Sequence, residues 1–390
     1  HQKNKQTNPV TIKKPSFGVH SNREIVPPFT KNNLTPPDNF VTKFMNSWEL
    51  NFKDTNGISS KALEKEGVRY LAVFTIEEGI ELREAGVKSD ILLYSKLNPH
   101  GVDSAIKHKL TLNISSFDDL EILKQHNVQE HTLKVHLKID TGMTRLGVDH
   151  NHAEDFFRQA RDIDHIEIEG LYSHFATADE GDLTYAKSQL DKFNAVLTIA
   201  EELDINPVLV HCSNSGAILN LPESRFNLIR TGMLLYGGFP SDEVPQDLSI
   251  KPVMTFTAPV VEIRNVKAGT HISYGGVYTT KENTRIAVVQ AGFADGVPRP
   301  WYVDGFVKFK DKEMKITGRI CMDQLMIDIG SNDIKYGDEV LIFGSNQHGT
   351  IPVNKIAKTI DSTSYVLVTA IGSRPKRIYI DTMLNDLKRH

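Results

Sequence analysis

The sequence predicts two domains, a barrel of parallel strands and helices followed by a mainly antiparallel β domain. Two observations support this α/β class. Between about residues 46 and 240, short apolar runs alternate with amphipathic helical patterns; after Pro240, alternating β-branched runs are separated by Gly, Asp and Asn turns. Eight such strand-and-helix units are typical of a (β/α)8 TIM-like barrel. An open, doubly wound sheet is the alternative, because periodicity does not reveal closure.

The elements follow in order along the chain. Residues 1–45 are rich in Lys, Asn, Thr and Pro and lack periodicity, so we expect a poorly ordered arm. Residues 46–240 form the predicted barrel, and residues 241–390 the predicted β domain. Thr75 and Glu78 predict a capping box at the start of a helix. The predicted barrel strands are Leu50–Lys53, Tyr70–Phe74, Ile91–Ser95, Leu110–Ile114, Lys134–Asp140, Ile168–Phe175, Leu209–Asn214 and Asn227–Gly232; those of the β domain are 253–263, 285–290, 306–310, 313–317, 325–329 and 339–343.

The composition favours a small-molecule ligand. The 390 residues carry a formal charge of −4 and no Lys/Arg block in the body of the chain, which argues against nucleic acid as a partner. No apolar run is long enough to span a membrane. Cys212 and Cys321 both lie in apolar stretches, as free thiols do in a reducing compartment. His1 begins no signal-like segment, so we expect a cytoplasmic protein or one already trimmed.

Polar residues gather at the carboxyl ends of the predicted barrel strands, where barrel enzymes place their active sites. They are Lys138, Asp140 and Arg145 after the fifth strand, Ser173 and His174 in the sixth, His211, Asn214 and Ser215 after the seventh, and Arg230 and Gly232 at the eighth. Ser215 is either a phosphate ligand or a turn serine. Arg230, in an apolar run, needs either a structural salt bridge or a ligand nitrogen or carboxylate. His174 is either a core histidine or a functional one. We predict no metal site.

Eight segments together resemble the alanine racemase family, whose enzymes use pyridoxal 5′-phosphate (PLP). They occur in that family's order and cover roughly residues 64–380. The segments are "KIDTGMTRLGV" (138–148), "EGLYSHFATAD" (169–179), "HCSNSGAIL" (211–219), "NLIRTGMLLYG" (227–237), "HISYGGVYTT" (271–280), "AGFADGVPR" (291–299), "GRICMDQLMID" (318–328) and "RPKRIYI" (374–380).

The resemblance implies roles for individual residues. Tyr274 would be the base on one face of the substrate, reaching in from the other subunit of a head-to-tail homodimer, and the PLP lysine would serve the opposite face. Met322 would meet the substrate carboxylate, also from the partner subunit. The cofactor would be held by Arg230 at the pyridine nitrogen, Arg145 at the phenolic oxygen and near the substrate, His174 against the ring, Ser215 and Tyr365 at the phosphate, and amides near Gly232 and Met233. Lys138 would be the often carbamylated lysine. The substrate implied is alanine.

The beginning of the chain departs from the family. The family's Lys-Ala-Asn-Ala-Tyr-Gly-His-Gly type of segment, which carries the PLP lysine and a phosphate-binding tyrosine, is absent, and similarity begins around residues 60–73. Counting Leu50–Lys53 as the first strand gives eight strands and puts Lys53 at its carboxyl end, where the PLP lysine belongs; Lys61, inside a predicted helix, is the poorer candidate. Phe293 stands where the family commonly has Tyr, which predicts altered substrate access. A serine or broad-specificity racemase and an inactive paralogue without a usable lysine are the alternatives.

Overall fold

The computed structural model describes residues 47–49, 57–126 and 132–379 of the chain, with only the backbone for 47–49. Two large hydrophobic clusters lie in the described residues, one drawn from residues 68–221 and the other from residues 256–371. The predicted N-terminal arm and the range Leu50–Lys53 lie outside the described residues.

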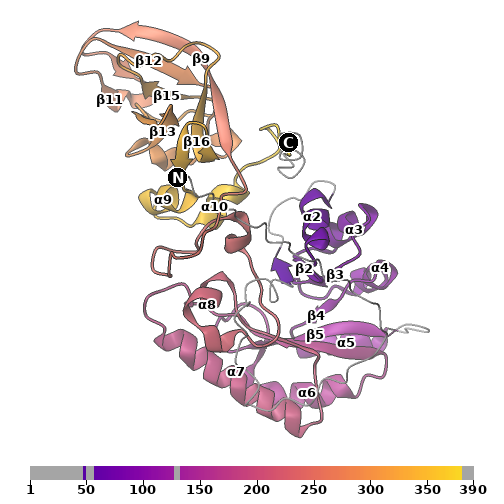
Figure 1. Ribbon diagram of the computed structural model, residues 1–390. Helices are drawn as coiled ribbons and strands as arrows, with labels where there is room; N and C mark the ends of the chain where they lie inside the picture. The colour runs from indigo at the N-terminus through magenta and orange to yellow at the C-terminus, as the bar shows by residue number, and fades with distance from the viewer. Residues whose placement is uncertain (1–46, 50–56, 127–131, 380–390) are drawn as a thin grey trace, which may run out of the picture. The chain divides into compact units, whose positions relative to one another are not determined.

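The first part alternates strands with helices along the chain (Figure 1). Its strands are β1 (Ser47–Glu49), β2 (Tyr70–Val73), β3 (Asp90–Leu93), β4 (Leu112–Ile114), β5 (Leu133–Asp140), β6 (Val148–Asp149), β7 (Ile166–Tyr172) and β8 (Leu209–His211). Its helices are α2 (Ile58–Lys65), α3 (Ile76–Glu84), α4 (Val102–Lys107), α5 (Phe117–Gln125), α6 (Ala153–Arg161), α7 (Thr184–Glu202) and α8 (Ser215–Asn220). The capping box is confirmed, because Thr75 Oγ1 accepts from Glu78 N and Glu78 Oε2 accepts from Thr75 N.

The strands pair in parallel and in chain order, as a barrel requires. Hydrogen bonds join β1, β2 and β3, and others join β4, β5, β7 and β8; a parallel bridge between Leu92 and Thr111 links the two sets. A doubly wound sheet would reverse its order at a switch point. Tyr70 Oη of β2 donates a 2.6 Å hydrogen bond to Glu169 Oε2 of β7. In a flat sheet these strands would stand about 19 Å apart, so the sheet curls round on itself.

Two details of the predicted barrel strands differ in the structure. A two-residue strand, β6, pairs with β5 between Val148 and Ile139 and was not predicted. The prediction of a strand at Asn227–Gly232 is wrong, because this segment forms no continuous strand. Arg230 N donates to Ser213 O, but Val210 N is bonded by the side-chain oxygen of Asn227. A side chain thus replaces a backbone carbonyl and interrupts a regular ladder with β8.

The second part is an antiparallel sheet with two helices, and the six strands predicted for it are confirmed. The sheet order is β14-β13-β16-β9-β12-β15, with β17 beside β16. The elements are β9 (Phe256–Val266), β10 (His271–Ile272), β11 (Tyr278–Thr279), β12 (Thr284–Val289), β13 (Phe306–Phe309), β14 (Lys312–Lys315), β15 (Leu325–Asp328), β16 (Glu339–Asn346), β17 (Gly349–Ile351), α9 (Val353–Thr359) and α10 (Ser364–Thr369). The α/β class with a following antiparallel domain is therefore confirmed.

Candidate active site

Arg230 lies at the centre of a buried polar cluster at the carboxyl ends of β7 and β8. Its Nη2 donates to the carbonyls of Ser173 (2.8 Å) and Cys212 (3.2 Å) and lies 3.0 Å from His174 Nδ1. Its Nη1 lies 2.8 Å from His211 Nδ1. Arg230 is 1 % exposed and makes no ion pair with a carboxylate within the described ranges. The structural salt bridge considered for this residue is therefore not what holds it.

Burial and this arginine keep the neighbouring histidines neutral. Burial lowers the pKa of His211 well below its ordinary value of 6.5, and the positive charge of Arg230 lowers it further. The same two causes, in the same order, lower the pKa of His174, to which Arg145 and Lys138 add smaller effects. A neutral imidazole can accept a hydrogen bond from a guanidinium. Both histidines therefore serve as acceptors that orient Arg230.

Tyr172 packs between the charged groups of the cluster. Its ring stacks on that of His211 with centroids 4.6 Å apart, and the Arg230 Cζ atom lies 5.4 Å from the centroid. Lys138 Nζ is 5.3 Å from the same centroid, and Lys138 is buried. The Tyr172 hydroxyl donates to Asn113 Oδ1 at 2.8 Å. Two positively charged groups thus lie close enough to one aromatic ring for cation–π attraction.

Ser215 and Gly232 meet where the last two predicted strands end. Asn214 caps α8 by accepting from Ala217 N, and the next residue, Ser215, accepts a 3.0 Å hydrogen bond from Gly232 N. Ser215 and Met233 are buried. The structure thus brings together three residues predicted for phosphate binding.

Arg145 lies in the loop after β5. Asp140 Oδ1 accepts from the backbone N–H groups of Gly142 (2.8 Å) and Thr144 (3.1 Å), which shapes this loop. Gly147 has a φ of 122°, and a Cβ there would lie 2.7 Å from Asp140 N, so the loop needs glycine at this point. Arg145 itself is exposed.

The predicted site residues of the β domain lie on loops, and two of them are strongly exposed. Tyr274 is 67 % exposed and Met322 is 55 % exposed. Their loops touch, because Ser273 Oγ donates to Arg319 O at 2.6 Å. The Met322 loop also contacts a third loop, where Ala294 N donates to Met322 O at 3.0 Å. Ser273, before Tyr274, has a φ of 63° and a ψ of −174°, a strained conformation for a residue with a side chain.

Of the other predicted residues, Tyr365 lies partly buried on α10, and its place near the phosphate stays a prediction. Phe293, 41 % exposed, donates its N–H to Cys321 O beside the Met322 loop. Lys53 lies outside the described residues. Lys61 is exposed on α2.

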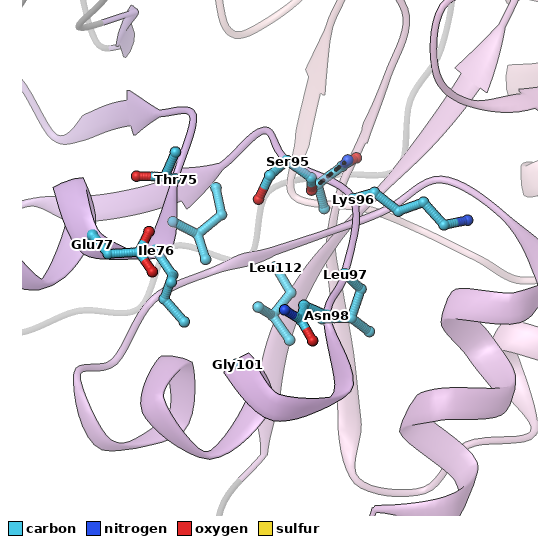
Figure 2. A pocket seen from close by; sticks show the side chains of 11 residues that line it. Thr75, Ile76, Glu77, Ser95, Lys96, Leu97, Asn98, Gly101 and Leu112 are labelled. Atoms are coloured by element: carbon cyan, nitrogen blue, oxygen red, sulfur yellow. Dashed lines mark hydrogen bonds between the residues drawn. The ribbon is translucent and has the colours of Figure 1, made fainter.

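A pocket of about 240 Å³ lies at the carboxyl ends of β2 and β3, beside β4 (Figure 2). It is bordered by residues 75–77 at the start of α3, by residues 95–98 after β3, and by Leu112 and Asn113 of β4. The Lys96 ammonium group points away from Thr75 and Glu77 and lies 2.8 Å from Ser116 Oγ. The pocket includes none of the predicted site residues. Asn113, which bonds Tyr172, connects its wall to the Arg230 cluster.

Sequence reasoning missed three residues of the barrel interior, His136, Glu169 and Tyr70. His136 Nδ1 lies 2.9 Å from His211 Nε2, and Tyr70 donates to Glu169. The alternation along residues 133–140, in which polar residues 134, 136, 138 and 140 occupy one face of the strand, is a signal that could have found His136.

Within residues 57–126 and 132–379, no helix combines the length and apolar character needed to cross a membrane. In the same part of the chain, no group of three or more His, Cys, Asp or Glu residues is arranged to hold a metal ion.

Comparison with known proteins places the chain in a family. Residues 58–240 match the model "Alanine racemase, N-terminal domain", and residues 253–379 match "Alanine racemase, C-terminal domain". The chain is 39 % identical over 330 residues to the alanine racemase of Desulforamulus reducens, covering 83 % of this chain and 87 % of that protein. It is 36 % identical over 323 residues to alanine racemase 1 of Caldanaerobacter subterraneus subsp. tengcongensis, covering 82 % and 83 % of the two chains.

Solved structures agree with this match. The alanine racemase of Clostridium difficile 630 superimposes with a TM-score of 0.79 and 34 % identity, covering 87 % of this chain and 90 % of that one. The alanine racemase of Streptomyces lavendulae, a D-cycloserine producer, gives a TM-score of 0.80 and 31 % identity, covering 88 % and 92 %. The chain therefore belongs to the alanine racemase family.

Proposed function

We propose that this chain is a PLP-dependent racemase that interconverts L-alanine and D-alanine and supplies D-alanine for peptidoglycan in the cytoplasm. Arg230 carries the proposal. It is a buried guanidinium, held by neutral histidines and backbone carbonyls instead of a carboxylate, at the end of the barrel where such folds bind ligands. A guanidinium in that position can donate to an acceptor atom of a ligand.

The described residues fit PLP. Arg230 Nε makes no hydrogen bond within the described part of the chain, which leaves an N–H donor for an unprotonated pyridine nitrogen. The Ser215 hydroxyl, which accepts from Gly232 N–H at 3.0 Å, keeps its own O–H to donate to a phosphate. We assign His174 to the ring face and Arg145 to the phenolic oxygen and the substrate carboxylate. We further assign Lys138 to positioning Arg145, and Met233 and Tyr365 to the phosphate.

The proton transfers would belong to two residues. When bound, PLP supplies an electron sink that makes the substrate Cα–H acidic. Racemisation requires a proton to leave one face of Cα and another to arrive on the opposite face. We assign the Tyr274 hydroxyl to one face and the Lys53 amine to the other. Arg230 cannot protonate the pyridine nitrogen, so it weakens the sink and favours proton exchange over transamination.

The exposure of Tyr274 and Met322 supports a site shared between subunits. Two large side chains held on neighbouring loops of the β domain, 67 % and 55 % exposed, are suited to contact another chain. We propose a head-to-tail homodimer in which each subunit lends these residues to the barrel of the other. A monomer would then hold PLP without racemising alanine.

The segments "SHFATAD" and "CMDQ" favour alanine over serine or a broader substrate range. One observation favours a second candidate, an impaired paralogue. The family model begins to match at residue 58, and the family's usual lysine segment is absent from the residues before it. Whether Lys53 binds PLP covalently distinguishes the racemase from the impaired paralogue.

The test is to purify the protein with PLP, record its visible absorption, reduce it with borohydride and map the labelled peptide by mass spectrometry. The proposal predicts a cofactor absorption band, a pyridoxyl label on Lys53 and interconversion of the alanine enantiomers. A label on another lysine would contradict only the assignment of Lys53 and would leave the proposed racemase activity standing. A folded protein with neither band nor label would establish the impaired paralogue.

Lys61→Ala is the matched control for Lys53→Ala. Lys61 is exposed on helix α2, eight positions later in the sequence. Lys53→Ala is expected to abolish the label and the activity, whereas Lys61→Ala is expected to change neither. Equal loss in both variants would indicate a general effect of the substitutions on this part of the chain.

A further inference from the structure

Four side chains form a connected path through the barrel interior, which we name the His–Glu relay: Arg230, His211, His136 and Glu169. Arg230 Nη1 lies 2.8 Å from His211 Nδ1, and His211 Nε2 lies 2.9 Å from His136 Nδ1. His136 Nε2 lies 3.5 Å from Glu169 Oε2, which is within ion-pair distance but does not meet hydrogen-bond geometry. Both histidines are 0 % exposed. The path joins the carboxyl ends of the strands to the middle of β5 and β7.

The chemistry of each contact sets the position of every proton along the path. A guanidinium only donates, so His211 Nδ1 must accept. Burial, and then the charge of Arg230, lower the pKa of His211 well below 6.5, so this imidazole is neutral and carries its one proton on Nε2. That proton is donated to His136 Nδ1. Burial also lowers the pKa of His136, so its own proton lies on Nε2 and faces Glu169.

Glu169 provides the negative end. Its Oε1 lies 2.5 Å from Lys134 Nζ, and its Oε2 accepts from Tyr70 Oη at 2.6 Å. Burial alone would raise the pKa of Glu169, but contacts with His136, Lys134 and Tyr70 outweigh it and bring the pKa to about 2. A carboxylate and a guanidinium thus face each other across two neutral imidazoles.

The backbone is shaped to permit this path. The pairing of β5 with β7 shifts register between Val135 and His136, so Glu169 is the extra residue of a bulge. Bulges redirect side chains. Next to it, a Cβ on Gly170 would lie 2.5 Å from the His136 ring atoms Cγ and Nδ1. Glycine at this position makes room for the imidazole.

We propose that Glu169 is a positioning residue for Arg230, acting through His136 and His211 to hold the guanidinium with its free N–H groups directed at the cofactor. The positioning role rests on the proposed function, whereas the order of protons along the relay does not. Glu169 touches neither substrate nor cofactor in this scheme, and acts only through the polarisation of the two imidazoles.

The first experiment uses the full chain without added PLP. Protein labelled with ¹⁵N-histidine is examined by long-range ¹H–¹⁵N NMR, with His136→Gln and His211→Gln used to assign the signals. Both histidines are expected to be neutral, with the proton on Nε2. A charged imidazole, or a proton on Nδ1 of either residue, would overturn the relay.

Two variants then test whether a change at Glu169 alters the chemical shift of the His211 Nε2–H proton, and the two expected shifts have opposite signs. Glu169→Gln removes the terminal charge, so the Nε2–H proton of His211 is expected to shift upfield although His211 does not touch Glu169. Tyr70→Phe removes a donor that competes for Glu169 Oε2, so the same proton is expected to shift downfield. Glu167→Gln, an exposed glutamate on the same strand, is the matched control and is expected to shift neither. Shifts of the same sign in both relay variants, or none, would overturn transmission. If Glu169→Gln does not fold, Tyr70→Phe alone decides.

The second experiment measures PLP affinity by absorbance titration. Glu169→Gln is expected to weaken binding roughly tenfold relative to Glu167→Gln, and that effect is expected to vanish in a His136→Gln background, because coupling through a relay needs its middle member. An unchanged affinity, or an effect that persists without His136, would overturn the positioning role. A parent protein that binds no PLP would contradict the proposed function, and the cofactor-free spectra would still decide the relay.

Discussion

The residues assigned to the site in the barrel and those assigned in the β domain are held in opposite ways. Arg230 and Ser215 are about 1 % exposed, and several hydrogen bonds fix the Arg230 side chain. Tyr274 and Met322 are more than half exposed, on loops of the second domain. The barrel half is built within one chain, whereas the β-domain half presents its groups outward. The difference indicates that substitutions in the first half act on stability as well as function, and those in the second on function alone.

The largest expected effect comes from the exposed half. Tyr274→Phe removes only a hydroxyl assigned to proton transfer, so alanine racemisation is expected to fall about 10²- to 10⁴-fold. The free energy of unfolding is expected to stay within about 0.5 kcal/mol of the parent, because an exposed side chain is changed. Racemisation assays and urea titrations check the two parts. A clear loss of stability in Tyr274→Phe would contradict the expectation that substitutions in the β-domain half affect function alone.

Arg230→Met tests the buried half. Removing the guanidinium leaves His211 Nδ1 and the Ser173 and Cys212 carbonyls without its hydrogen bonds, so the free energy of unfolding is expected to fall by about 3 kcal/mol. Arg161→Met is the control, since Arg161 is exposed on α6 and bonds one carbonyl. Urea unfolding of both variants is the measurement, and equal stability would show that the buried arginine is not structurally integrated.

Stability should also depend on pH through the buried histidines. His136 and His211 have folded-state pKa values below the ordinary 6.5, so below that pH the unfolded chain binds protons that the folded chain does not. Stability is therefore expected to fall as the pH drops below about 6.5, by up to ~1.4 kcal/mol per pH unit for each histidine. Glu169, with a pKa of about 2 against an ordinary 4.5, adds a further loss below pH 4.5.

Unfolding titrations between pH 7 and pH 4 check this dependence. His136→Gln is expected to make the decline in stability below pH 6.5 shallower. His150→Gln changes a histidine that is only partly buried, so it is expected to leave the decline unchanged. A stability that stays constant from pH 7 to pH 5 would contradict the neutral, buried imidazoles.

Gly170→Ala is expected to have the smallest of these effects. The added Cβ would overlap the His136 ring, and relieving that overlap typically costs about 1–3 kcal/mol. At Gly372 a Cβ would have nothing within 4 Å, so Gly372→Ala is the matched control and is expected to change stability by less than about 0.5 kcal/mol. Thermal unfolding compares the two, and equal values would show that the space beside Gly170 is not needed.

Most of the fold could be predicted from the hydrophobic pattern of the strands. Periodicity located β2 to β5 and the six main strands of the β domain, because burial of one side of a helix or sheet imposes a repeat on the local sequence. Periodicity failed at Asn227–Gly232, where a side-chain amide takes the place of a backbone acceptor. The apolar run in the sequence does not indicate this replacement.

What the sequence by itself determined is the family, the α/β class and a set of polar residues at strand ends, since each of these follows from motifs or from neighbours along the chain. Only the tertiary structure decided which of these residues meet. Arg230, His211, His136 and Glu169 are separated by up to 94 positions between residues 136 and 230, and their contacts depend on closure of the sheet and on one bulge. Sequence periodicity describes which side of a strand is buried. Proton positions and pKa shifts arise from distances across the barrel, which only the closed fold sets.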